Sequence, residues 1–238
     1  MSGRLIGASL GPGDPGLITR ASWQVLTNGS AWAYPISKPG HPGYALAIAQ
    51  RAGLTPPGQV LELHFPMVRD QALLAGHWQA AAQQVLTILQ QGEDVVFLVE
   101  GDASSYATFG HLARTVTTLQ PEVKVTVIPG VSSPQASAAR IATPLAENED
   151  VMVMLPATRG MAVVDQLLDH CNCMALLKIR PVLDELLDLL ERRGLLPYAT
   201  FVERVGTPEE RIIRDVASLR GSDVNYLSLM LVRRPLSP

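Results

Sequence analysis

Gly11-Pro12-Gly13-Asp14-Pro15 is the first of three glycine-centred loops in this chain, each placed directly after an apolar run. It follows Leu5-Ile6-Gly7-Ala8 and leads into a helical pattern that begins near Leu17. Two glycines and two prolines within five residues cannot continue a helix or a central strand, so we expect a rigid loop. Folds of the α/β class place ligands at such strand-to-helix junctions. Taken alone, the stretch fits an ordinary turn equally well, because Gly and Pro punctuate many turns.

Outward from this loop, short apolar runs alternate with longer amphipathic stretches. The expected strands are 5–6, 31–34 (ended by Pro35), 60–63, 95–99, 123–128, 151–155, 174–177, 198–202, 210–215 and 226–232. The expected helices are 17–26, 43–51, 71–91, 104–119, 161–169 and 182–193. No long helix separates the last three strands, which favours antiparallel pairing among them. The pattern predicts an α/β protein with two α/β lobes, residues 1–119 and 120–238.

Composition narrows the classes of partner that the chain can bind. It has 238 residues, of which 47% are hydrophobic and 17% charged, and its net charge is -3. Nucleic-acid binding through phosphates is disfavoured because there is no basic excess. No apolar run approaches the roughly 20 residues that cross a bilayer, and no signal peptide is visible, so we expect a cytoplasmic protein without a membrane partner.

The two cysteines, Cys171 and Cys173, are too close together to frame a disulfide scaffold. His170 lies beside them, but the spacing fits no structural zinc pattern. We therefore expect no protein-bound metal and a reducing location.

Two further loops follow apolar strands, at Glu100-Gly101-Asp102-Ala103-Ser104-Ser105-Tyr106 and at Ile128-Pro129-Gly130-Val131-Ser132-Ser133-Pro134. Asp102 could accept hydrogen bonds from ribose hydroxyls or cap a helix. Ser132 and Ser133 could cap the next helix or donate to a ligand. Neither loop matches the glycine patterns of a P-loop or a dinucleotide-binding fold, which disfavours those two classes of site.

Together, the three loops resemble the signature loops of the tetrapyrrole methylases, S-adenosylmethionine-dependent enzymes of corrin and sirohaem synthesis. The segment 203–211, Glu-Arg-Val-Gly-Thr-Pro-Glu-Glu-Arg, is similar to a late motif of the same family. Order and spacing match over nearly the whole chain. Segments 65–70, 106–109 and 151–157 are most similar to the precorrin-2 and cobalt-factor II C-20 methyltransferases. Two positions depart from the family pattern, which usually has Gly in place of Ser9 and Pro in place of Ala103.

The resemblance implies a class III methyltransferase with two α/β lobes and S-adenosylmethionine in a cleft between them. Carried over by motif, the cofactor-binding residues are Pro12, Glu100, Gly101, Asp102, Ser105, Ser132, Ser133, Leu155, Val205 and Gly206. The family also implies a homodimer and a tetrapyrrole substrate, methylated at C-20 in cobalamin biosynthesis.

Candidate catalytic acids or bases are Asp14, Asp102 and Tyr106, with His111 beside them in the same loop region. His41 and His64 are further residues that titrate near neutral pH. The substrate is a polycarboxylate, so its site should offer cations; the candidates are Arg20, Lys38, Arg69 and Arg140. Arg pairs with carboxylate in a bidentate manner, which favours Arg20 and Arg69 over Lys38. Each of the four could instead be an ordinary solvated surface charge.

Two alternatives stay open. One is another member of the family that acts at a different ring carbon or on a different substrate, such as that of diphthine synthesis. The other is a non-catalytic, cofactor-binding relative, for which the departures at Ser9 and Ala103 are the support. Residues 65–70 favour the C-20 branch over the first alternative, and cofactor binding without methyl transfer to any tetrapyrrole would favour the second.

Overall fold

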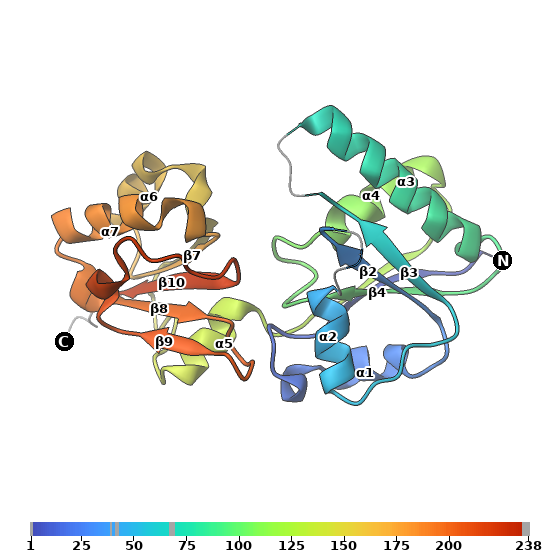
Figure 1. Cartoon of the computed structure of the whole chain (residues 1–238), viewed down its shortest axis with the longest axis horizontal. Coiled ribbons are helices and arrows are strands. Elements are labelled where there is room, and N and C mark those ends of the chain that lie inside the picture. The colour runs from blue at the N-terminus through green and yellow to red at the C-terminus, as the bar shows by residue number, and fades with distance from the viewer. Residues whose placement is uncertain (1, 39, 41–42, 67–69, 235–238) are drawn as a thin grey trace. The chain divides into compact units, whose positions relative to one another are not determined.

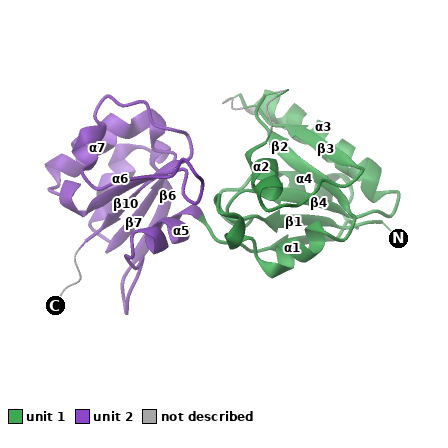
Figure 2. Ribbon diagram, turned by 60° about the horizontal axis from the view of Figure 1, so that its bottom comes forward, with its two compact units in different colours: residues 1–132 green, residues 133–238 purple. Residues whose placement is uncertain are grey.

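The chain divides into two compact units, Met1–Ser132 and Ser133–Pro238, each an α/β structure, as predicted (Figure 2). The computed structural model describes residues 2–38, 40, 43–66 and 70–234. Over those residues, no helix combines the length and the apolar character that a membrane span requires.

The first unit is built on a five-stranded parallel sheet in the order β3-β2-β4-β1-β5. Figure 1 labels β2, β3 and β4 of this sheet. Its strands are β1 (Leu5–Ser9), β2 (Ala31–Ile36), β3 (Val60–His64), β4 (Val95–Val99) and β5 (Val125–Ile128). Its helices are α1 (Arg20–Leu26), α2 (Tyr44–Arg51), α3 (Gln71–Leu89) and α4 (Phe109–Leu119), with a 3₁₀ turn at Pro15–Leu17. The strands read as apolar runs because helices cover both faces of the sheet.

Neighbouring strands β1 and β4 lead to helices on opposite faces of this sheet. Ile6 and Leu98 share a core cluster with residues of α1 and α2. Leu5 and Phe97, one residue away along the same strands, belong to a cluster with α3 and α4. This alternation follows from the two-residue period of a strand. The carboxyl ends of β1 and β4 therefore form a topological switch point, where open parallel sheets bind their ligands.

Two expected boundaries in this unit are wrong for local reasons. Pro35 does not end the second strand but lies within β2, which pairs with β3 through Ile36. Proline is tolerated there because pairing of β2 with β4 has already stopped at Ala33, so no ladder bond is lost on that side. The helix expected at 104–119 begins only at Phe109, since Tyr106 has a φ of 53°, outside the helical region.

The second unit has a mixed five-stranded sheet in the order β6-β7-β10-β8-β9. Its strands are β6 (Met152–Pro156), β7 (Cys173–Leu177), β8 (Ala199–Glu203), β9 (Arg211–Ile213) and β10 (Ser228–Arg233). Its helices are α5 (Ser133–Arg140), α6 (Met161–Leu168) and α7 (Leu183–Arg192), with 3₁₀ turns at Ala157–Arg159, Arg180–Val182, Leu196–Tyr198 and Val216–Leu219. Strand β10 runs antiparallel to β7 and β8, and β8 runs antiparallel to β9, so the predicted antiparallel pairing of the last three strands is confirmed. The core of this unit joins the sheet to α6 and α7.

The division between the units differs from the expected one after residue 119. It lies after Ser132, because β5 pairs in parallel with β1 and so completes the first sheet. The polar Gln120-Pro121 turn only connects α4 to that edge strand.

Candidate functional site

The first and second glycine loops meet at the switch point of the first sheet. Gly11 and Gly101 form an antiparallel bridge, in which the Gly101 N–H donates to Gly11 O at 2.8 Å and the Gly11 N–H donates to Gly101 O at 3.2 Å. Their φ values are 75° and 69°, in the left-handed region that glycine adopts without a steric penalty. The bridge holds the ends of β1 and β4 together beyond the sheet itself.

The second loop presents the carboxylate of Asp102 at this edge. Asp102 Oδ1 accepts from the backbone N–H of Ser104 at 2.8 Å and from its hydroxyl at 2.9 Å. The Ser105 N–H donates to Asp102 O at 3.1 Å. Asp102 therefore closes a tight turn rather than capping a helix, and its Oδ2 accepts no bond from the described residues. A Cβ at Gly101 would meet no atom within 4 Å, so a ligand has room to approach the backbone beside this carboxylate.

The third loop packs against the other two at a buried serine. Ser9, the last residue of β1, is fully buried; its Oγ donates to Ile128 O at 2.6 Å and accepts from the Ala103 N–H at 2.9 Å. A Cβ at Gly130 would overlap the Cβ of Ser9 and lie 2.9 Å from Gly101 O. The three loops are thus in van der Waals contact, which requires glycine at position 130.

Glu100 follows the carboxyl end of β4, and its carboxyl group has a shifted pKa. The residue as a whole keeps an exposed surface, yet desolvation of its carboxyl group raises the pKa from 4.5 to about 7. Glu100 is therefore close to half-ionised at neutral pH. This places a pH-sensitive charge directly before Gly101.

Two side chains of α2, which the sequence did not mark as functional, donate hydrogen bonds to the backbone of the first loop. The Tyr44 hydroxyl donates to Pro12 O at 3.1 Å, and Arg51 Nη2 donates to Gly13 O at 2.7 Å. Asp14, a candidate acid or base, caps the 3₁₀ turn through a 2.8 Å bond from the Gly16 N–H to its Oδ1. No sequence signal could have revealed the α2 contacts, because they join residues about 32 and 38 positions apart.

Two other candidate residues lie at or near the start of α4. Tyr106 is 53% exposed and sits in the left-handed region, an unfavourable conformation for a bulky residue. The His111 ring stacks on Trp78, with 5.0 Å between ring centroids, and its Nδ1 lies 3.1 Å from Arg114 Nη2. Strain of this kind is often found at functional loops, and it agrees with a role for Tyr106.

In the second unit, the residues predicted to contact the cofactor, Leu155 and Val205-Gly206, lie at the same end of the sheet. Strand β6 is parallel to β7, and β7 and β8 are both antiparallel to β10, so β6 and β8 share a direction. Leu155 lies near the carboxyl end of β6, and Val205 follows the end of β8. Both residues therefore lie at the carboxyl ends of strands that run in the same direction, which is consistent with one shared site within this unit.

Arg140, a candidate cation for the substrate, makes an ion pair within the second unit, and its role toward the substrate stays a prediction. Its Nε lies 3.2 Å from Glu210 Oε2, and the same oxygen accepts from the Gly206 N–H at 2.6 Å. Arg140 and Glu210 therefore hold the Gly206 turn to the end of α5. Of the other candidate cations, Arg20 and Lys38 are exposed, and Arg69, like His41, lies outside the described residues.

We expect Glu210→Ala to weaken cofactor binding about tenfold, because it leaves the Gly206 N–H without its acceptor. The measurement is titration calorimetry with S-adenosylhomocysteine. Glu209→Ala is the matched control, since Glu209 is exposed and reaches Arg204 only at 4.0 Å. Equal affinities in the two variants would contradict a positioning role for Glu210.

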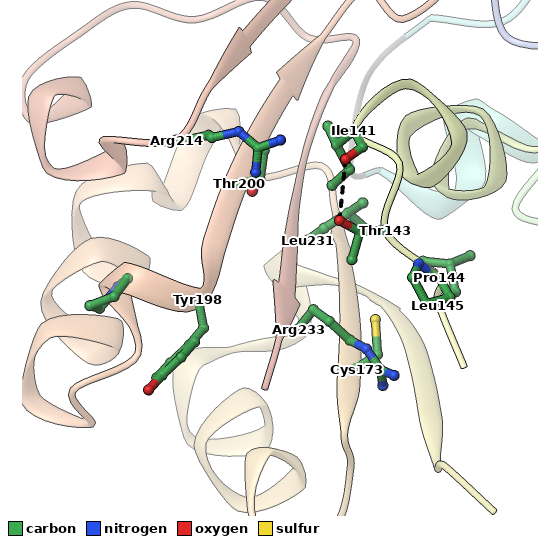
Figure 3. A pocket seen from close by; sticks show the side chains of 11 residues that line it. Ile141, Thr143, Pro144, Leu145, Cys173, Tyr198, Thr200, Arg214, Leu231 and Arg233 are labelled. Atoms are coloured by element: carbon green, nitrogen blue, oxygen red, sulfur yellow. Dashed lines mark hydrogen bonds between the residues drawn. The ribbon is translucent and has the colours of Figure 1, made fainter. Parts of the chain in front are cut away.

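A small pocket of about 150 Å³ lies elsewhere in the second unit, between the segment after α5 and strands β8 and β10 (Figure 3). Arg214, Thr200 and Arg233 are among its lining residues, and none of the predicted site residues is. Arg233 is already paired with Asp150 at 2.6 Å. The pocket is therefore separate from the residues that the motifs identified.

Metal ligands do not gather within the part of the chain that the structure describes. There, no group of three or more His, Cys, Asp or Glu side chains could hold an ion, and Cys171 and Cys173 are free, buried thiols. The absence of a protein-bound metal stays a prediction.

Comparison with known proteins identifies the family. The profile of the tetrapyrrole (corrin/porphyrin) methylases matches residues 4–219. The chain belongs to this family. Among curated relatives of this chain, the precorrin-2 C(20)-methyltransferase of Sinorhizobium sp is 30% identical over 97% of this chain and 95% of its own length. The cobalamin biosynthesis protein CobIJ of Mycobacterium tuberculosis is also 30% identical, but this chain spans only 46% of its length.

Solved structures share the fold of this chain. Uroporphyrin-III C-methyl transferase from Thermus thermophilus, complexed with S-adenosylhomocysteine, has a TM-score of 0.68 at 21% identity and covers 97% of both chains. At that identity the likeness establishes the fold, and ligands and substrates must be argued from the residues of this chain.

Proposed function

We propose that this methylase transfers a methyl group from S-adenosylmethionine to C-20 of precorrin-2 or cobalt-factor II, in cobalamin biosynthesis. The observation that supports the proposal is the Gly11–Gly101 bridge at the switch point, which places Asp102, whose Oδ2 accepts no bond from the described residues, next to the open backbone of Gly101. The near full-length similarity to a precorrin-2 C(20)-methyltransferase supports the choice of substrate.

The loop residues fit the cofactor chemically. Asp102 Oδ2 is suited to accept from ribose hydroxyls, and the backbone at Gly101 is open to close approach. Pro12, Glu100, Ser105 and Ser132 complete the contacts proposed for the first unit, and Ser133, Leu155, Val205 and Gly206 those for the second. All ten remain proposals for binding the cofactor.

In the proposed reaction, the nucleophilic C-20 carbon forms a bond to the methyl carbon, and the sulfur–methyl bond breaks with its electron pair left on sulfur. S-adenosylmethionine supplies the activated methyl group. The proton on C-20 then leaves to a base, for which Asp14, Asp102 and Tyr106 are the candidates. The chain mainly has to orient the two reactants, which contributes up to about 7–11 kcal/mol in favourable cases.

We expect S-adenosylmethionine affinity to rise severalfold between about pH 6 and pH 8, since Glu100 ionises near pH 7 and its carboxylate attracts the cationic ligand. Glu100→Gln should remove this dependence, whereas Glu93→Gln, a change at an exposed glutamate of the same unit, should keep it. Titration calorimetry at several pH values measures the effect.

The same titration has a consequence for the ligand-free protein. A raised pKa favours the neutral folded form, so stability from this group is present below about pH 4.5 and lost as pH rises through about 7. Glu100→Gln should therefore gain stability relative to the wild type at pH 8 but not at pH 4. An unchanged difference across that range would argue against the desolvated carboxyl group.

The test of the function is methyl transfer from labelled S-adenosylmethionine, with precorrin-2 and its cobalt-bound form offered in parallel. The position of the new methyl group is read by NMR. Transfer at C-20 of one form supports the proposal and selects the substrate. Cofactor binding without transfer to either form overturns it, and favours another family substrate or a non-catalytic relative. A cytoplasmic homodimer that binds neither nucleic acid nor membrane stays part of the proposal.

A further inference from the structure

The buried hydroxyl of Ser9 is the point where all three loops of the first unit are joined. It belongs to β1, donates to the end of β5 at Ile128 O, and accepts from the loop after β4 at the Ala103 N–H. Ser9 is 0% exposed and Ala103 is 5% exposed, so water cannot replace either bond. A buried hydroxyl with both of its bonds made is a strong local constraint.

The hydrogen bond from the Ala103 N–H to Ser9 is one of several that fix the loop containing Asp102. The N–H of Gly101 donates to Gly11, that of Ser104 to the Asp102 carboxylate, and that of Ser105 to Asp102 O. The Ala103 N–H donates to Ser9 Oγ. Four amides of the loop, those of Gly101, Ala103, Ser104 and Ser105, are thus bonded before any ligand arrives, which lowers the entropic cost of binding.

We propose that Ser9 and Ala103 act as one coupled pair that positions the Asp102 loop for the cofactor. The residue at position 9 limits which residue can stand at position 103, through a hydrogen bond and through steric contact. Replacing Ser9 by glycine leaves the buried Ala103 N–H without an acceptor. Replacing Ala103 by proline removes that N–H and puts the ring Cδ where the hydrogen points at Ser9 Oγ, a direct clash. Making both changes removes the donor, the acceptor and the clash together.

The pair also explains the two departures noted in the sequence. Serine and alanine at these positions make a hydrogen bond to each other, so the departures from the family pattern leave the loop held at this point. This inference rests on the proposed function only where it concerns the cofactor.

A double-mutant cycle tests the coupling. The proteins are the wild type, Ser9→Gly, Ala103→Pro and the double variant, and the readout is the dissociation constant for S-adenosylhomocysteine by calorimetry. We expect each single variant to bind about tenfold more weakly, and the double variant to return to within about threefold of the wild type. Losses that simply multiply in the double variant would overturn the coupling.

A second readout does not depend on the cofactor or on proline fitting the loop. Hydrogen exchange at the Ala103 amide should speed up about tenfold or more in Ser9→Gly. It should stay at the wild-type rate in Ser137→Ala, which removes a buried hydroxyl that lacks a partner among the described residues. Unchanged exchange in Ser9→Gly refutes the pair. Failure of the wild type to bind S-adenosylhomocysteine, with faster exchange in Ser9→Gly, would instead refute the proposed function alone.

Discussion

Gly130→Ala is expected to weaken binding of S-adenosylhomocysteine by about a hundredfold, measured by titration calorimetry. The added Cβ would overlap the Cβ of Ser9 and stand 2.9 Å from Gly101 O. Both neighbours are fixed, Ser9 by its two hydrogen bonds and Gly101 by its bridge to Gly11. Overpacking costs about 1–3 kcal/mol, and here the strain falls on the loops proposed to bind the cofactor. Each tenfold loss corresponds to about 1.4 kcal/mol.

Two further variants separate this steric account from a general loss of stability. Gly58→Ala is the matched control, because a Cβ there would meet no atom within 4 Å, and its affinity should equal that of the wild type. Adding Ser9→Gly to Gly130→Ala removes the overlap with Ser9 but not the contact with Gly101 O. Gly130→Ala should therefore weaken binding less in the Ser9→Gly background than in the wild type. An equal loss in the two backgrounds would show that the overlap with Ser9 is not the cause.

Phe97→Ala is expected to lower the free energy of unfolding of the first unit by about 3–5 kcal/mol. Phe97 lies in the central strand β4, is 0% exposed, and packs against Phe109 with 5.8 Å between ring centroids. Small domains are stable by only about 5–15 kcal/mol, so this single change removes a large share of the total.

Tryptophan fluorescence during urea denaturation measures this effect in one unit alone, because Trp23, Trp32 and Trp78 all belong to the first unit. Leu119→Ala is the matched control from the same unit; its side chain is 43% exposed, and its transition should move little. A transition of Phe97→Ala that coincides with that of Leu119→Ala would show that the core against α3 and α4 contributes less than its burial indicates.

The amino-acid sequence alone was enough to predict the fold class and the positions of the three glycine-centred loops. Apolar runs such as Val95–Val99 are continuous because both faces of a parallel sheet are buried, and that signal is local in the chain. Glycine and proline at Gly11-Pro12-Gly13 likewise report a local backbone requirement, since only a few residue types tolerate such conformations. The family resemblance came from the same local motifs, and the profile match confirmed it.

Contacts between residues far apart in the chain decided the features that local sequence patterns did not predict. β5 joined the first unit because its hydrogen bonds go to β1, more than a hundred residues earlier, and no local pattern in 120–132 records that choice. The ion pair of Arg140 with Glu210 joins residues 70 positions apart and was not predicted for the same reason. Ser9, which stood out in the sequence only as a departure from a family pattern, makes its two hydrogen bonds only because the fold brings Ala103 and Ile128 within reach of its hydroxyl. A hydrogen bond depends on geometry to within fractions of an ångström, and residues far apart in the chain reach that geometry only when the sheet has formed.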